Sequence, residues 1–199
     1  MLWHAVRALC VPPIRAVFVV LAANDAQFAR EDWSAFGGKL HPLYCGGETR
    51  RDSVLNGLVA VRGTVDADDW ILVHDAARPC LPALDLQGLL KEGSGDAVGA
   101  ILALPVAETV KKAGKDEAGT ARVSATEDRS QLWLAQTPQM FRAGLLAQAL
   151  ERCPGATDES SAVEQIGLKP RLVAGSRENL KVTYPEDLAI AEAILARRA

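Results

Sequence analysis

The stretch Trp70-Ile71-Leu72-Val73-His74-Asp75-Ala76-Ala77-Arg78-Pro79 decides the fold class of this chain. Its first four residues are apolar, as in a buried strand, and polar residues follow at once. In open α/β sheets, ligands bind beyond the carboxyl ends of the strands. Asp75 can take a hydroxyl or a metal ion, and Arg78 can bind a phosphate with its guanidinium fork. A polar loop with a surface ion pair is the alternative interpretation.

The rest of the chain repeats this alternation of buried strands and helices. Strands are predicted at 14–21, 70–73, 97–104 and 132–136, with strand-like segments at 169–173 and 180–183. Helices are predicted at 2–10, 49–61, 84–90, 143–151, 159–166 and 185–197. This order predicts an α/β fold with a doubly wound, mostly parallel sheet and right-handed crossovers. We find no internal repeat or linker, so we expect a single domain over residues 1–199.

One segment, residues 106–126, interrupts the alternation. Two short polar strands at 108–112 and 120–124 flank a Gly-containing turn at 113–119, which predicts a β-hairpin. The hairpin has too few apolar residues to cover itself, and an isolated hairpin is marginally stable in water. We therefore expect this arm to pack on another subunit, with a loose surface loop as the alternative.

Composition and charge exclude several classes of protein. The chain has 199 residues, 49% of them hydrophobic and 24% charged, with a net charge of −3. This balance is typical of a globular protein and predicts no nucleic acid polymer as partner. The apolar run 14–23 is too short to span a bilayer, and no signal peptide is evident. We expect no membrane association.

Cysteines and histidines do not form a metal-binding pattern. Cys10, Cys45, Cys80 and Cys153 are far apart, and the three histidines do not supply zinc-ligand spacing. We expect reduced cysteines, a cytoplasmic location and no metal ligands from the protein.

A second candidate site precedes the helix predicted at 49–61. Gly46-Gly47 leaves backbone N–H groups free at a helix N-terminus, a position that favours anions. Ser53 and the glycine backbone could also read the edge of a nucleobase. Taken alone, the two glycines favour a plain turn over a binding site.

Three more polar segments follow predicted strands or begin helices. Thr137-Pro138-Gln139 lies at a ligand-facing strand end. Lys181 lies in an otherwise apolar strand, where lysine is seldom buried without a partner, so we expect a phosphate or carboxylate contact. Thr157-Asp158-Glu159 is interpreted first as a helix cap with an acidic first turn.

No Ser-His-Asp or Cys-His set can be assembled from these segments. What remains is one acid at a strand end, Asp75, together with Arg78, Arg129 and Lys181. This inventory suits phosphoryl or nucleotidyl transfer, which depends on positioning and charge stabilisation more than on a protein nucleophile.

Taken in order, these motifs resemble the 2-C-methyl-D-erythritol 4-phosphate cytidylyltransferases of the non-mevalonate isoprenoid pathway. The resemblance covers essentially the whole chain and implies a Rossmann-like fold of the nucleotide-diphospho-sugar transferase type. The residues that carry it are Gly46-Gly47 with Arg50 and Asp52-Ser53-Val54, Val73 to Pro79, Thr109, Leu132-Trp133 with Thr137-Pro138-Gln139, Thr157-Asp158-Glu159, Asn179 to Thr183, and Pro185 to Leu188.

The resemblance implies a reaction. The substrate's phosphate attacks the α-phosphorus of CTP, with Mg²⁺ held mainly by the CTP phosphates, and pyrophosphate leaves. The product is a CDP-linked methylerythritol. Three alternatives stay open: another polyol phosphate substrate such as ribitol 5-phosphate, a non-catalytic nucleotide-binding dimer, and an inactive truncation product.

The resemblance also implies residues that bind the nucleotide. Gly47 and Ser53 would hold the cytosine. Asp75 would contact the sugar-phosphate substrate near the nucleotide ribose. Ala76 would line the nucleotide.

The residues implied for the second substrate are more dispersed. Arg78 and Thr137 would shape its pocket. Thr109 and Arg129 would reach the neighbouring subunit's site in a homodimer formed through the 106–126 arm. Arg129 and Lys181, as the catalytic pair, would position the attacking phosphate.

The chain departs from the family pattern at its start. Family members open with a strand and a Gly-rich loop that carries an Arg and a Lys, whereas Met1 to Val6 match the helix after that loop. We therefore expect a domain without its first βα unit, a sheet with a gap or an exposed strand edge, and reduced activity. A start assigned too far downstream, a shortened clone and a natural short form all remain as explanations.

Overall fold

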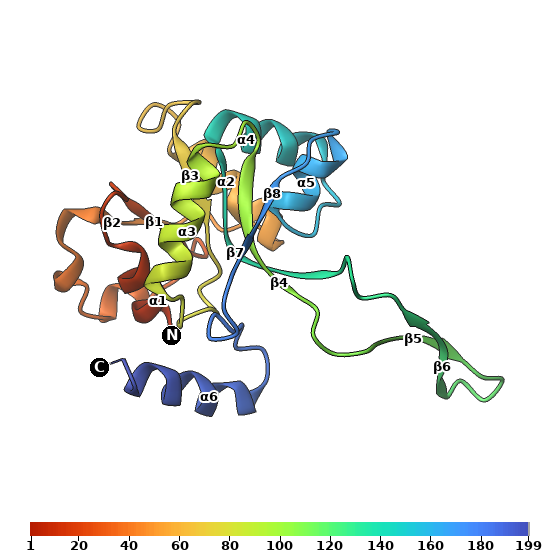
Figure 1. Ribbon diagram of the computed structural model, residues 1–199. Helices are drawn as coiled ribbons and strands as arrows, with labels where there is room; N and C mark the ends of the chain where they lie inside the picture. Colours follow the sequence, from red (N-terminus) through yellow and green to blue (C-terminus); the bar gives the residue numbers. More distant parts are fainter. Residues whose placement is uncertain (199) are drawn as a thin grey trace.

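The computed structural model describes residues 1–198 as a mixed α/β body with a long projecting arm (Figure 1). Its elements are α1 (Leu2–Leu9), β1 (Val17–Val20), β2 (Leu40–Leu43), α2 (Arg50–Ala60), β3 (Trp70–Val73), α3 (Ala83–Ser94), β4 (Gly99–Pro105), β5 (Val110–Lys115), β6 (Ala121–Glu127), β7 (Trp133–Arg142), α4 (Ala143–Arg152), α5 (Glu159–Gln165), β8 (Arg171–Ala174) and α6 (Pro185–Ala196). Two short 3-10 helices lie at Phe28–Arg30 and Ser34–Lys39.

The main sheet has the strand order β3-β7-β4-β8. Strands β4 and β8 are parallel, while β7 runs antiparallel to both β3 and β4. The α/β class is confirmed, but this sheet is mixed rather than mostly parallel. The reason is the arm: β4 leads out into it and β7 returns from it, so the two strands must run in opposite directions when they pair.

A second, smaller sheet consists of β1 and β2, which pair in parallel from Val17 with Leu40 to Val20 with Leu43. Strand β2 was not predicted, because its Leu-His-Pro-Leu sequence lacks apolar alternation and contains a proline, which cannot donate to a strand ladder. Within residues 1–198, β1 pairs only with β2 and β3 pairs only with β7. A cavity of about 1010 Å³ lies between β1 and β3. The sheet is thus broken here, with an open edge on each side.

The core lies on both faces of the main sheet, because successive strand residues point to opposite sides. On β7, Phe141 packs with Leu146 of α4, whereas Met140 packs with Leu89 of α3 on the other face. All four side chains are buried. Each contributes roughly 1.5–3 kcal/mol by leaving water. This packing holds the strand ends that carry the polar residues.

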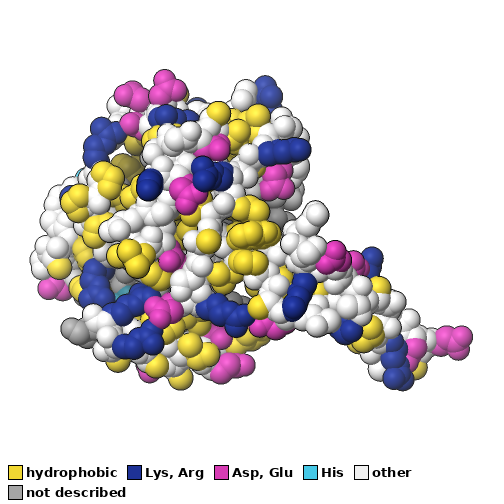
Figure 2. All heavy atoms as spheres, viewed as in Figure 1, with side chains coloured by type: hydrophobic (Ala, Val, Ile, Leu, Met, Phe, Trp, Pro, Cys, Tyr) yellow, Lys and Arg dark blue, Asp and Glu magenta, His cyan; other side chains and the backbone are white. Residues whose placement is uncertain are grey.

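The predicted hairpin is present as β5 and β6, and it projects away from the body (Figures 1 and 2). Its turn is shorter than expected. Asp116 accepts hydrogen bonds from the backbone nitrogens of Ala118 at 3.1 Å and Thr120 at 2.8 Å, and Gly119 adopts a φ of 78°. These contacts close the turn at 116–119 and leave Ala113 to Lys115 in the strand.

One predicted strand is wrong. The segment 180–183 is irregular chain between β8 and α6. It makes one strand-like contact, in which the backbone nitrogen of Val182 donates to the carbonyl oxygen of Ala77 at 2.8 Å. A single bond does not form a ladder, so Lys181 lies on a loop pinned beside the end of β3.

The remaining predicted elements are confirmed with shifted ends. Strand β7 continues beyond Gln136 to Arg142, and β8 begins at Arg171 rather than at residue 169. No helix within residues 1–198 combines the length and apolar character needed to cross a membrane.

Candidate active site

The loop that follows β3 is held by a chain of hydrogen bonds. His74 donates from Nε2 to the carbonyl oxygen of Arg78 at 3.1 Å, because a carbonyl can only accept. The Nδ1 atom of His74 therefore accepts from the hydroxyl of Thr137 at 3.0 Å. The same hydroxyl oxygen accepts from the backbone nitrogen of Asp75 at 3.0 Å. Burial lowers the pKa of His74 to about 4, so the imidazole is neutral near pH 7.

Asp75 is the centre of the charged cluster at this strand end. Its Oδ1 accepts from Nε of Arg50 at 2.8 Å, and its Oδ2 lies 3.1 Å from Nζ of Lys181. Nε of Arg78 is 3.9 Å from Oδ2. Burial favours the neutral acid, but Arg50 and Lys181 outweigh it and hold the pKa of Asp75 below its ordinary value. Asp75 is therefore an ionised anchor for cations and hydroxyls, not a proton carrier.

Arg50 links the Asp75 carboxylate to a second carboxylate, that of Glu159. Arg50 Nη1 and Nη2 bind Glu159 Oε1 and Oε2 at 2.8 and 3.0 Å. Burial raises the pKa of Glu159, although the Arg50 contacts oppose the rise. Burial also opposes the charge on Arg50, but Glu159 and Asp75 outweigh it and raise the pKa of Arg50. Neither residue was predicted as a site residue; the position of Glu159 in a cap motif concealed it.

Arg78 and Thr137 are buried, and their polar groups face the protein rather than an open pocket. Arg78 donates from Nη1 to the carbonyl oxygen of Asn179 at 2.6 Å and from Nη2 to that of Ala135 at 3.5 Å. Burial lowers the pKa of Arg78. Both residues join the β3 loop to β7, and Arg78 also joins it to the segment that carries Lys181.

The two glycines before α2 allow a close approach of the backbone. The backbone nitrogen of Gly47 donates to Oγ of Ser53 at 3.0 Å, and Oγ of Ser53 donates to the carbonyl oxygen of Thr49 at 3.0 Å. A Cβ on Gly47 would lie 2.5 Å from Cβ of Asp52. One on Gly46 would lie 2.9 Å from the carbonyl oxygen of Leu21. Glycine is thus required here by packing, beyond what a simple turn needs.

The cavity between β1 and β3 brings most of these residues together. Its walls are largely apolar, and its polar residues include Arg50, Ser53, Asp75 and Lys181, with Ala76 beside them. Gly47 adjoins this set through its bond to Ser53. Four predicted site residues, Ser53, Asp75, Ala76 and Lys181, therefore line one cavity although up to 128 positions separate them in the sequence (181 − 53).

Two predicted site residues lie elsewhere. Thr109 precedes β5 and Arg129 follows β6, and both are exposed on the arm. In the part of the chain that the structure describes, neither forms an ion pair or a side-chain hydrogen bond with Asp75, Arg50 or Lys181. One protomer alone therefore does not bring them to the cluster.

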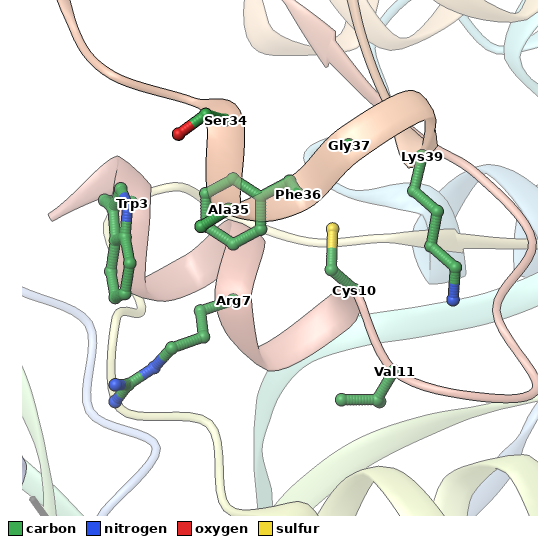
Figure 3. A pocket seen from close by; sticks show the side chains of 9 residues that line it. All are labelled: Trp3, Arg7, Cys10, Val11, Ser34, Ala35, Phe36, Gly37 and Lys39. Atoms are coloured by element: carbon green, nitrogen blue, oxygen red, sulfur yellow. The ribbon is translucent and has the colours of Figure 1, made fainter.

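A second hollow of about 640 Å³ lies between α1 and the 3-10 helix at Ser34–Lys39 (Figure 3). Its two cations are already engaged. The guanidinium carbon of Arg7 lies 5.2 Å from the ring centroid of Trp3, and Nζ of Lys39 donates to the carbonyl oxygen of Ile14 at 3.4 Å. No carboxylate lines this hollow. We therefore assign the candidate site to the Asp75 cavity.

The residues at the site do not fit a metal centre built by the protein. Within residues 1–198, no group of three or more His, Cys, Asp or Glu side chains is placed to hold a metal ion. Both carboxylate oxygens of Asp75 already face cations.

An α/β fold in which Arg50, Asp75 and Lys181 gather at the end of a strand is typical of proteins that bind a charged ligand beyond that end. Comparison with known proteins gives the family. The family model described as 2-C-methyl-D-erythritol 4-phosphate cytidylyltransferase matches residues 1–197. This chain belongs to that family.

Individual relatives support the same family assignment. The chain is 54% identical over 199 residues to 2-C-methyl-D-erythritol 4-phosphate cytidylyltransferase of Dechloromonas aromatica (strain RCB), covering 100% of this chain and 86% of the relative. It is 53% identical to that of Azoarcus sp. (strain BH72), covering 100% and 83%.

Solved structures are similar over nearly the whole chain. A crystal structure of 4-diphosphocytidyl-2C-methyl-D-erythritol synthase superposes with a TM-score of 0.87 at 40% identity, covering 98% of this chain and 89% of the other. The cytidylyltransferase of Thermus thermophilus superposes with a TM-score of 0.78 at 28% identity, covering 98% and 88%.

Proposed function

We propose that the Asp75 cavity carries out the reaction of the family, the transfer of CMP from CTP to 2-C-methyl-D-erythritol 4-phosphate in isoprenoid precursor biosynthesis. A phosphate oxygen of the sugar-alcohol phosphate bonds to the α-phosphorus of CTP. The bond from that phosphorus to the bridging oxygen breaks, and pyrophosphate leaves with the electron pair. The observation that carries the proposal is the ionised Asp75 with Lys181 at 3.1 Å, at the polar end of the cavity that Ser53 also lines.

Lys181 positions the attacking phosphate in this scheme. Its side chain is 47% exposed, against 11% for Asp75, so its ammonium group has a free side toward a ligand. A fixed positive charge attracts the phosphate and stabilises the negative charge that develops during transfer. The carboxylate of Asp75 holds the ammonium group of Lys181 and accepts hydrogen bonds from hydroxyl groups near the ribose.

Gly47, Ser53 and Ala76 bind the nucleotide. Gly47 is exposed, and its N–H donates to Oγ of Ser53 at 3.0 Å, so its carbonyl oxygen is the backbone group that would meet a base edge. Ala76 is small enough to let the nucleotide lie close to the β3 loop. Arg78 and Thr137 keep this loop in place.

Arg129 and Thr109 act in the partner's site of a homodimer that forms through the arm. Every residue of β6 is exposed in one protomer, as are several large apolar side chains on the arm and at its base. These apolar side chains are Val123, Leu132, Trp133 and Leu134. Exposed apolar side chains on a projecting hairpin favour burial against a partner. A second copy of this chain would bury them and would also bring Thr109 and Arg129 into the partner's site.

Mg²⁺ would enter with the CTP triphosphate, whose oxygens are the ligands it prefers. The protein's own contribution is the cationic cluster. We further propose a cytoplasmic location, in keeping with four free cysteines at positions 10, 45, 80 and 153.

Pyrophosphate release tests the proposal. The purified chain is incubated with CTP, Mg²⁺ and 2-C-methyl-D-erythritol 4-phosphate, and ribitol 5-phosphate is the comparison substrate. We expect release with the methylerythritol phosphate at the higher kcat/KM and loss of release in Lys181→Ala. The family match does not favour the ribitol phosphate. Calorimetric CTP binding without release from either substrate would instead support a non-catalytic nucleotide-binding dimer.

A further inference from the structure

Glu159 does not use its side chain to cap its own helix. It is the first residue of α5, and the N-terminus of that helix is capped by Asp158, which accepts from the backbone nitrogen of Ser161 at 2.9 Å. The side chain of Glu159 is 0% exposed. A buried carboxylate costs several kcal/mol unless cations or hydrogen-bond donors compensate it. Its presence therefore requires an explanation other than capping.

The contacts of Glu159 lead to the site. Both of its oxygens bind the terminal nitrogens of Arg50, at 2.8 and 3.0 Å. The third nitrogen of Arg50, Nε, binds Oδ1 of Asp75 at 2.8 Å. Because a guanidinium group is planar and rigid, holding two of its nitrogens fixes the direction of the third.

The two ends of this chain of charges differ in exposure. The side chain of Glu159 is 0% exposed and that of Lys181 is 47% exposed, while Arg50 and Asp75 between them are 35% and 11% exposed. Arg50 comes from α2 and Glu159 from α5, while Asp75 follows β3. The buried end is thus anchored on a helix, and the open end faces the cavity.

We propose that Arg50 and Glu159 are positioning residues: Glu159 fixes the guanidinium of Arg50, which in turn fixes the Asp75 carboxylate opposite Lys181. This inference rests on the proposed function, because the value of the positioning lies in holding Lys181 for phosphate transfer. A structural tie between α2 and α5 alone would not require Nε to reach Asp75.

The chain offers a matched control pair. Nη2 of Arg62, just after α2, binds Oε1 of Glu151 in α4 at 2.8 Å, and both side chains are more than half exposed. This pair joins the other end of α2 to another helix, and neither of its residues lines the cavity. Arg62→Lys and Glu151→Gln therefore repeat the chemistry of Arg50→Lys and Glu159→Gln outside the site.

The first measurement is exchange of the Arg50 Nε–H proton, observed by nuclear magnetic resonance and assigned by its loss in Arg50→Lys. We expect a protected signal in the unsubstituted protein and an exchange rate about tenfold higher or more in Glu159→Gln. Glu151→Gln should leave the rate unchanged. An unchanged rate in Glu159→Gln would overturn the inference, whether or not the protein has activity.

The second measurement is pyrophosphate release per folded molecule. Misplaced groups typically cost up to about 100-fold, so we expect kcat/KM to fall about 10- to 100-fold in Arg50→Lys and Glu159→Gln. Both controls should stay within about twofold, the usual range for exposed pairs. Wild-type activity with unchanged kcat/KM in both site variants would overturn the inference. Absence of release from the wild type would instead overturn the proposed function, and the exchange measurement would still decide the positioning.

Discussion

The hydroxyl oxygen of Thr137 on β7 accepts a hydrogen bond from the backbone nitrogen of Asp75 at 3.0 Å. The hydroxyl proton goes to Nδ1 of His74, also at 3.0 Å. One side chain therefore satisfies two half-buried groups of the loop after β3. This contact holds the backbone of Asp75, while Arg50 and Lys181 hold its carboxylate.

Removing that hydroxyl should destabilise the protein. Thr137→Val keeps the shape of the side chain but leaves the Asp75 nitrogen and His74 Nδ1 without a partner. A fully buried group left without a partner costs about 1–3 kcal/mol, and these two groups are half-buried. We therefore expect a total loss of about 1–3 kcal/mol in the free energy of unfolding. Urea unfolding measures it. Thr137→Ser, which retains the hydroxyl, should lose much less, and equal losses in the two variants would contradict the role of the hydrogen bonds.

The stability of the protein should fall as the pH is lowered from 6.5 toward 4. The pKa of His74 is about 4 in the folded state, lowered by burial from an ordinary 6.5. Between these values the unfolded chain binds a proton that the folded protein does not, so acid favours unfolding. The effect has an upper bound of about 3 kcal/mol, from 1.36 kcal/mol per pKa unit. Above pH 6.5, His74 does not change the free energy of unfolding with pH.

Urea unfolding across pH 4–7 checks this dependence, with His74→Gln as the comparison. The variant removes the titrating group, so its unfolding free energy should vary less with pH in this window. The pKa of His4 is lowered as well, mainly by burial, and its contribution remains in both proteins. Identical pH slopes for the two proteins would refute the assignment to His74.

Lys181 and Arg129 should complement each other between subunits. Lys181→Ala and Arg129→Ala should each lower kcat by about 100-fold or more, as expected for a lost electrostatic group. If Arg129 acts in the partner's site, a mixed dimer contains one site with both residues intact. Random exchange of the two variants should then restore roughly a quarter of wild-type activity.

Activity after mixing and refolding the two variants measures this complementation, and light scattering measures the mass. Mixing either variant with itself is the control. A monomeric mass, or no recovery after mixing, would exclude the arm-mediated dimer as the arrangement that completes the site.

Gly47→Ala should weaken CTP binding. The added Cβ would lie 2.5 Å from Cβ of Asp52, so the backbone that Ser53 holds must move. We expect about a tenfold higher Kd, equivalent to 1.4 kcal/mol. Calorimetry with CTP measures it. Gly38→Ala is the control, because a Cβ there meets nothing within 4 Å and should leave the Kd unchanged.

Much of the fold could be predicted from local patterns. Apolar runs predicted β3 and β4, and the polar hairpin around Gly119 predicted the arm, because burial and turn formation depend on residues close in sequence. The direction of β7 could not be predicted, since it depends on where the chain returns after the arm. Strand β2 was missed because its Leu-His-Pro-Leu sequence shows no alternation of apolar and polar residues. Lys181 was placed on a strand because its apolar neighbours resemble one.

The sequence by itself determined which chemical groups are present: one acid after a strand, cations for phosphates, and glycines before a helix. Only the tertiary structure decided which of them meet. Arg50 lies 109 positions from Glu159 in the chain, yet the two form a bidentate ion pair. This pair directs Nε of Arg50 to Asp75. No local pattern encodes such a contact, because the pairing of buried charges depends on how α2, α5 and β3 pack together.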